Sequence, residues 1–303
     1  MPEGASGVPL DVLYALASVV SFTTASFIFR RFTRIAGPDW VNAFKATLAT
    51  VIFASVFVSD VVRTGALPSF SPGIWLVLLV SGLIGLNLSD RFMLGAYQSI
   101  GPARTMMVYR FQPLYLGLLG FVFLGQTLSF SQLSAIGLFI ACVIVIADEQ
   151  RKTLGTWSWV GLSTAAAGML LDGTGVMLSS WAFRHAESLD ANTANLIRGG
   201  GALAGFWYLS RRRPYRLLET FASFKTRNRV LALAGCVLGT FVGLTFWLKA
   251  LQVGEAARVS ATAGAAPVLA LLIEAGIEKR APSRHAIFAL ALCLAGFVLL
   301  LRN

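Results

Sequence analysis

Residues 230–251 read VLALAGCVLGTFVGLTFWLKAL, an apolar run with one charged residue, Lys249. A helix needs about 20 mostly apolar residues to cross about 30 Å of hydrocarbon, so this stretch predicts a membrane-spanning helix. Gly235, Gly239 and Gly243 are spaced four residues apart and give the helix a face on which another backbone can approach closely. We therefore expect a packed bundle of helices in a bilayer, with this row serving helix packing rather than ligand contact.

The whole chain has the composition of a membrane protein. Of its 303 residues, 56% are hydrophobic and 13% are charged, and the mean hydropathy is +0.72. An average soluble domain has about 25% charged residues, so this inventory cannot cover a surface exposed to water. No Lys or Arg precedes the first apolar run, and we therefore expect a retained first span rather than a cleaved signal peptide.

Applied along the chain, the same length rule predicts an all-α polytopic membrane protein with ten spans. Gly-Pro and Pro-rich breaks such as Gly37-Pro38 and Gly101-Pro102 separate the apolar runs. The predicted spans lie near residues 9–29, 39–58, 73–97, 102–124, 130–147, 158–182, 191–209, 230–251, 256–276 and 284–301.

The chain repeats itself. A shift of 154 residues, without a gap, aligns identical residues at seven positions: Gly85 with Gly239, Ala96 with Ala250, Gln98 with Gln252, Ala103 with Ala257, Arg104 with Arg258, Pro113 with Pro267, and Ser129 with Ser283. We therefore expect two five-helix halves, residues 1–150 and 151–303. Because five is odd, the second half would enter the membrane from the opposite side, which makes the repeats inverted and permits alternating access.

The net charge of +11 mainly reports membrane topology. Of the 25 Lys and Arg residues, 16 fall on the side of the odd-numbered loops, four on the other side, and five within spans. The positive-inside rule then places the odd loops in the cytoplasm and both termini outside. The basic loop 211–229 also suits anionic lipid headgroups. We expect no nucleic-acid partner, and the lipid bilayer and a small-molecule substrate as the partners of a monomer.

Two segments carry a more specific resemblance. The first runs from Pro113 through Gly125 and Ser129, and the second from Pro267 through Ser283. Together with the ten spans and two halves, they resemble the EamA type of the drug/metabolite transporter superfamily, whose members carry amino acids and other metabolites. The resemblance implies an inner-membrane transporter without an enzymatic activity. The sequence departs from the family pattern at the Glu that usually follows the Gly, where it has Gln126 and, in the second half, Arg280.

Charged residues inside spans are the candidates for a substrate site, because each must face a cavity, a partner or the interface. Lys45 and Arg198 occupy matching positions in the two halves under a shift of 153, as do Asn42 and Asn195 three residues earlier. This duplication indicates that the four side chains face a central cavity. The five cations in spans, which also include Arg91, outnumber three acids, and this excess favours a substrate with an anionic group.

Residues 109–113 are the most informative stretch of this kind. Tyr109, Arg110 and Gln112 precede Pro113, which leaves a carbonyl without its helical donor. The matching stretch before Pro267 holds only Ala and Gly. We expect Arg110 to bind the anionic group and Tyr109 and Gln112 to orient it. The alternative is that Arg110 pairs with Asp172 or Glu274 and only holds helices together.

Two acids and a glycine cluster complete the predicted site. Asp172 and Glu274 lie within spans and are the candidate cavity acids or carriers of a coupling proton. Gly199 and Gly200 follow Arg198, and glycine costs a helix about 1 kcal/mol relative to alanine. With Pro113 and Pro267, these glycines are candidate helix breaks or gating points, and close packing is the other interpretation.

The prediction from the sequence is a secondary transporter of small organic metabolites, amino acids or organic anions, that alternates access around a cavity at the membrane midplane. Efflux of lipophilic cations, with Asp172 and Glu274 as binding acids, is the second hypothesis, and a membrane protein without transport activity the third. No cofactor or metal is predicted, because the three cysteines and two histidines show no ligand spacing.

Overall fold

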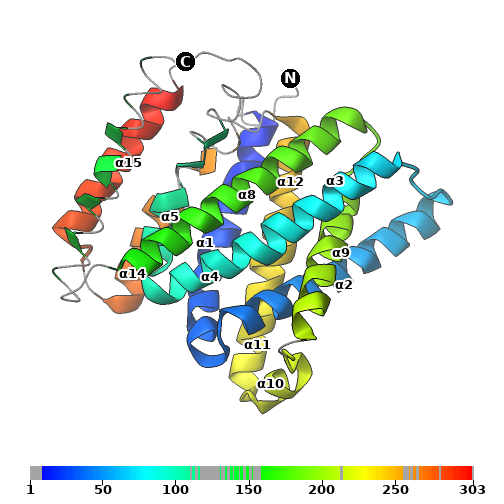
Figure 1. Cartoon of the computed structure of the whole chain (residues 1–303), viewed down its shortest axis with the longest axis horizontal. Helices are drawn as coiled ribbons and strands as arrows, with labels where there is room; N and C mark the ends of the chain where they lie inside the picture. Colours follow the sequence, from blue (N-terminus) through cyan, green and yellow to red (C-terminus); the bar gives the residue numbers. More distant parts are fainter. Residues whose placement is uncertain are drawn as a thin grey trace.

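The computed structural model describes residues 9–109, 158–211, 214–254, 266–279 and 281–301, with isolated positions between 111 and 152 and between 259 and 263. Every element in these residues is a helix (Figure 1). In the first half they are α1 (Leu10–Ala36), α2 (Pro38–Thr64), α3 (Pro72–Gly82), the π-helical segment η1 (Leu83–Ser89), α4 (Asp90–Ser99) and α5 (Pro102–Tyr109). In the second half they are α8 (Trp159–His185), α9 (Ala191–Ser210), α10 (Leu217–Ser223), α11 (Thr226–Gly235), the π-helical segment η2 (Cys236–Val242), α12 (Gly243–Val253), α14 (Ala266–Glu278) and α15 (Arg284–Leu301).

Five of the described helices are long and apolar enough to cross a membrane. They cover Leu10–Ala36, Pro38–Thr64, Pro72–Ser99, Trp159–His185 and Thr226–Val253, close to five of the predicted spans. Shorter apolar helices begin at Ala266 and Arg284, and α9 has 20 residues. Much of the predicted spans 102–124 and 130–147 and part of 256–276 lie outside the described residues, so the number ten stays a prediction.

The helices begin and end where glycine and proline permit it. Gly37 has φ +86° and separates α1 from α2, which then starts with Pro38 at its first position. A positive φ of this size costs a residue with a side chain much more than it costs glycine. Gly101, with φ +83°, makes the same kind of break before Pro102. The dipeptides that marked span ends in the sequence are therefore the actual turns.

The repeat is visible in the packing. The segments η1 and η2 begin 153 residues apart, each in the middle of the third helix of its half. Each of these helices packs on the first helix of the other half: η1 and α4 contact α8, and η2 and α12 contact α1. In Figure 1, α8 runs alongside the helix formed by α3, η1 and α4. The second helices, α2 and α9, contact each other between these pairs.

Small residues allow these contacts, as the sequence predicted. A Cβ atom at Gly239 would lie 2.5 Å from the Cβ of Ala25 in α1, and at Gly235 it would lie 2.8 Å from Ile28. Ser81 and Ser89 occupy the equivalent positions in the first half, 154 residues before Gly235 and Gly243. They donate hydrogen bonds to the carbonyls of Gly175 and Gly168 in α8, at 2.8 and 2.9 Å. The two rows therefore fix the interface between the halves.

Polar and apolar side chains are distributed as a bilayer requires. Large apolar side chains such as Val62, Val160 and Leu272 lie exposed on outer faces. Charged and amide side chains lie buried instead, among them Lys45, Asn87 and Arg198. Buried polar groups need partners or a cavity, and both are found at the interface of the two halves.

Candidate functional site

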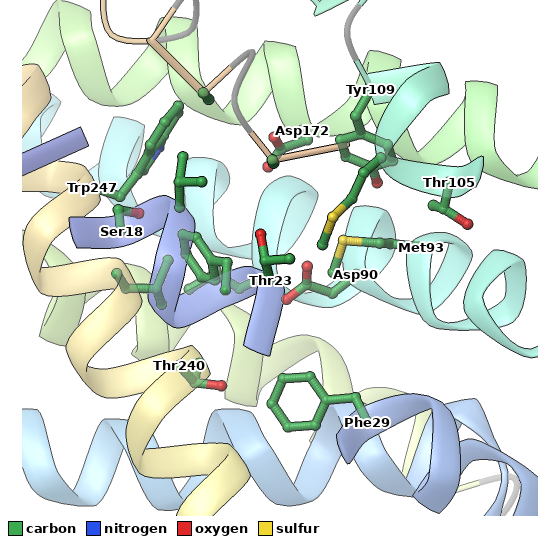
Figure 2. A pocket seen from close by; sticks show the side chains of 18 of the residues that line it. Ser18, Thr23, Phe29, Asp90, Met93, Thr105, Tyr109, Asp172, Thr240 and Trp247 are labelled. Carbon is green, nitrogen blue, oxygen red and sulfur yellow. The ribbon is translucent and has the colours of Figure 1, made fainter. Parts of the chain in front are cut away.

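A cavity of about 150 Å³ lies between the halves and is lined by helices from both. A cavity of about this size in an engineered protein core accommodates benzene, so the space suits a small molecule. Figure 2 shows Thr23, Asp90, Met93, Tyr109 and Asp172 around this space. The wall is formed by Ser18, Val19, Phe22, Thr23, Phe29, Lys45, Leu86, Asp90, Met93, Tyr97, Thr105, Met106, Tyr109, Gln112, Asp172, Arg198, Gly239, Thr240, Leu244, Trp247, Ala263 and Ala266.

Lys45 and Asp90 form an ion pair in this wall. The Lys45 Nζ atom of α2 contacts Asp90 Oδ2 at the start of α4. Lys45 is 5% exposed and Asp90 is 8% exposed, so the pair is shielded from water except through the cavity. The ammonium also lies 5.9 Å from the centre of the Phe29 ring. Asp90 was not among the predicted site residues, and in the sequence it adjoins Arg91 near the end of the predicted span 73–97.

Arg198 lies in the same wall and forms no ion pair with a described residue, although the charges of Asp172 and Asp90 act on it. Its Nε donates to Ser81 Oγ at 3.1 Å, and its buried Nη1 donates to no described atom. A guanidinium in an apolar site loses the hydration of each N–H group that finds no acceptor. Arg198 therefore presents an unused donor and a positive charge, and the residue is 2% exposed.

Asp172 of α8 supplies the opposite charge. Its Oδ2 accepts a hydrogen bond from Gln112 Nε2 at 2.7 Å, and no cation within the described residues forms an ion pair with it. Glycines in α8 make room for the neighbours: a Cβ at Gly168 would lie 2.6 Å from the Tyr109 hydroxyl, and at Gly173 2.8 Å from the Tyr115 ring. The glycines beside Asp172 therefore permit close packing within a continuous helix.

The two predicted asparagines lie beside the cavity rather than in its wall. Asn42 Nδ2 donates to the carbonyl of Asn87 in η1 at 2.8 Å. Asn195 lines a second cavity, of about 10 Å³, together with Lys45 and Thr240. Neither polar side-chain atom of Asn195 has a partner among the described residues, although the residue is 1% exposed. A space of this size holds about one water molecule, which is the ordinary partner for such an amide.

Glu274 is placed elsewhere. It lies 3.5 Å from Arg30 Nη1 and 4.0 Å from Arg104 Nη1, in an ionic cluster that links the halves beyond the cavity wall. Arg104 also binds Glu149, at 2.9 Å, and Ser283 donates to the same carboxyl. Burial favours the neutral form of Glu149, but these hydrogen bonds and the charge of Arg104 outweigh it and hold the pKa of this carboxyl below its ordinary value.

The remaining predicted site residues divide into three groups. Arg110 and Pro113 lie outside the described residues. Pro267 is in the first turn of α14, next to Ala266 of the cavity wall. Helix α9 continues through Gly199 and Gly200 without a break, and a Cβ at Gly199 would lie 2.3 Å from Thr50 Oγ1 of α2. The geometry at Gly199 supports close packing, and a gating role for these residues stays a prediction.

The charge balance of the wall differs from the count made on the sequence. Of the five cations predicted within spans, Arg91 pairs with Asp39 at an exposed position, and Lys249 lies 5.9 Å from the centre of the Tyr14 ring. The described wall holds two cations, Lys45 and Arg198, and two acids, Asp90 and Asp172. Cations and acids are equal in number in the described wall, so their count does not support an anionic substrate. The support comes from Arg198, whose Nη1 donor is unused.

Sequence reasoning missed several polar residues in the wall or in contact with it. Thr23 and Thr240 each have a buried hydroxyl without a described partner, and Ser81 anchors Arg198. Hydroxyl residues are common in spanning helices because they can bond the preceding turn of the backbone, so nothing in the sequence distinguished these three. Asp90 had a usable signal, as an acid inside an apolar run in the same half as Lys45.

Comparison with known proteins follows the two halves of the chain. A sequence model of the EamA-like transporter family matches residues 10–147 and again residues 159–302. No curated protein matches the chain. A solved structure described as "Crystal structure of protein" superposes with a TM-score of 0.67 at 17% identity, covering 95% of this chain and 94% of the other. This likeness shows the fold alone.

Proposed function

Because the chain belongs to the EamA-like transporter family and is a membrane transporter of the drug/metabolite type, we propose that it carries small organic metabolites with a carboxylate group. Amino acids and organic acids are the substrate classes. The two halves rock about the cavity between them as inverted repeats, in a bacterial inner membrane, with the odd-numbered loops in the cytoplasm.

The observation that carries the proposal is the unused donor of Arg198. Arginine binds carboxylates through paired N–H groups, and such charge-assisted hydrogen bonds are about twice as strong as neutral ones. In the wall of a cavity, this guanidinium attracts an anionic group and fixes its position. The apolar remainder of the substrate would contact Phe22, Met106 and Trp247, which line the same space.

Asp172 favours amino acids within this class. It carries a negative charge into the same cavity as Arg198, and neither forms an ion pair with another described residue. An amino acid carries both complementary charges and would satisfy both side chains at once. Tyr109 and Gln112 lie beside Asp172 and would orient the ammonium end of the substrate.

Uptake into proteoliposomes tests the proposal. The panel contains radiolabelled amino acids, organic acids and sugar phosphates, and we expect transport of at least one carboxylate. Arg198→Leu should abolish that transport, whereas Arg91→Leu should not, because Arg91 is exposed and paired with Asp39 outside the cavity. Transport of no carboxylate would overturn the substrate class, and full activity of Arg198→Leu would overturn the assignment of the anion site.

Efflux of lipophilic cations is the second candidate, and the combination of Asp172 with aromatic walls favours it. Cells that express the protein would then resist cationic dyes, and Asp172→Asn would remove the resistance. Under the carboxylate proposal, expression gives no such resistance. The same dyes would also fail to compete with carboxylate uptake in proteoliposomes.

A further inference from the structure

The ion pair of Lys45 and Asp90 has no counterpart at the equivalent positions of the second half. Lys45 corresponds to Arg198, 153 residues later, but the positions 153 and 154 residues after Asp90 hold Gly243 and Leu244. Of two equivalent cations in the cavity wall, one is therefore neutralised by a carboxylate and the other is not.

A contribution to folding stability does not explain why position 90 holds an acid. Removing two charges from water costs several kcal/mol per ion, and a buried ion pair often stabilises a protein no more than apolar residues of similar volume. The matching position already shows that Gly243 or Leu244 fits in the repeat without a charge. The carboxylate of Asp90 borders the cavity and contacts an ammonium, a group that a substrate carboxylate would also bind.

We propose that Asp90 takes up one proton when a substrate carboxylate binds, and that this releases Lys45 to pair with the substrate. The inference rests on the carboxylate proposal above and names its coupling residue. A carboxylate held by Arg198 adds a further negative charge to a cavity whose wall already holds Asp90 and Asp172. Like charges close together favour the neutral form of one of them. The Asp90 oxygen gains a proton from water, Lys45 stays protonated, and the substrate stays ionised.

The surroundings of Asp90 are consistent with this exchange. The titratable or charged groups around it are Lys45 from α2, Arg198 from α9, Asp172 from α8, Tyr109 from α5, Tyr97 from α4 and Cys236 from η2. Helix α1 contributes Ser18, Thr23 and apolar side chains to the wall. The buried hydroxyl of Thr23 has no described partner, and Thr23 and Asp90 line the same cavity (Figure 2).

Thermodynamic linkage between proton uptake and substrate binding determines how the affinity depends on pH. If binding one carboxylate takes up one proton, affinity for the carboxylate rises as pH falls, by about tenfold per pH unit. Proton and substrate then cross the membrane together, so a proton gradient drives accumulation. Arg198 and Lys45 share the bound carboxylate from the two halves of the cavity.

Calorimetry in two buffers of different ionisation enthalpy counts the protons directly. The probes are L-leucine and benzoate, titrated into the full chain in detergent. We expect about one proton taken up per probe bound by the wild type and none by Asp90→Asn. Lys45→Met should also take up none, because this variant has no ammonium to transfer from Asp90 to the substrate. Lys45→Arg should restore the uptake, which a purely structural role of the pair would not predict.

Asp39→Asn is the matched control. Asp39 is also paired with a cation, Arg91, but lies exposed outside the cavity, and its variant should take up as many protons as the wild type. Binding without proton uptake by the wild type overturns the coupling role and leaves the carboxylate proposal intact. Uptake that persists in Asp90→Asn and disappears in Asp172→Asn transfers the role to Asp172 and overturns the inference. Binding of neither probe and of no carboxylate in the transport panel overturns both.

Discussion

Replacing Gly201 with alanine is the most direct test of how the halves are joined. A Cβ at Gly201 would lie 2.0 Å from the carbonyl oxygen of Leu79 in α3, and at Gly82 it would lie 1.8 Å from the carbonyl oxygen of Arg198. Ordinary van der Waals contact begins at 3.4 Å, so the crossing of α3 and α9 would have to open by about 1.4 Å. The obstacle is backbone, which cannot rotate away as a side chain can.

The adjacent Gly200 provides the control. A Cβ there meets only Leu79 Cδ2, at 3.7 Å. Both substitutions gain about 1 kcal/mol of helix propensity, but overpacking costs roughly 1–3 kcal/mol, and the backbone obstacle places Gly201→Ala at the upper end. We therefore expect Gly201→Ala to be less stable than Gly200→Ala by about 3 kcal/mol.

Thermal unfolding in detergent, followed by size-exclusion chromatography, measures this difference. At roughly 2 °C per kcal/mol for a chain of this size, the two midpoints should differ by about 6 °C. Gly201→Ala should also lose transport, because Arg198 lies one turn away on the same helix. Equal midpoints for the two variants would refute the close crossing.

Three further predictions concern single contacts. Ser81→Ala removes the acceptor of Arg198 Nε, and because such a bond contributes about 0.5–1.5 kcal/mol, calorimetry should find carboxylate affinity reduced by roughly 2- to 12-fold. Asn87→Leu removes the 3.0 Å hydrogen bond that Asn87 Nδ2 donates to the Ala202 carbonyl and should destabilise the protein by about 0.5–1.5 kcal/mol in the same unfolding assay, and an unchanged midpoint would contradict the contact. Because the pKa of Glu149 is held below its ordinary value, its ionised form stabilises the fold above about pH 4.3, and that stability is lost as pH falls through the lowered pKa. Glu149→Gln should therefore show a flatter loss of unfolding temperature on acidification than the wild type.

Residue patterns predicted the helices well, because glycine and proline act locally. Gly37-Pro38 and Gly101-Pro102 end and begin helices through their own backbone preferences, whatever packs around them. The π-helical segments were not predicted, because widening a turn depends on neighbouring helices rather than on a residue type. The duplication of Lys45 and Arg198 predicted that both would face one cavity, and both line it. Their role in binding substrate stays a prediction.

Partnerships between charged side chains were harder to foresee. Glu274 and Asp172 looked alike in the sequence, as single acids in apolar runs. The structure pairs Glu274 with arginines away from the cavity and leaves Asp172 in its wall. Which acid meets which cation depends on the rotation of each helix about its axis. A shift of one residue turns a side chain by about 100°, and the sequence does not fix that rotation for a helix that is apolar on all sides.

The equivalent positions of the two π-helical segments bear on how the chain evolved. A π turn arises when a helix accommodates one extra residue, and η1 and η2 hold theirs at positions 153 residues apart. Two independent insertions at equivalent places are a less economical history than one insertion inherited twice. On this history, a half-length ancestor already had the widened turn before its sequence was duplicated. The two copies now differ in charge, with Asp90 beside Lys45 in one and Gly243 or Leu244 at the positions equivalent to Asp90 in the other, so this difference arose after the duplication.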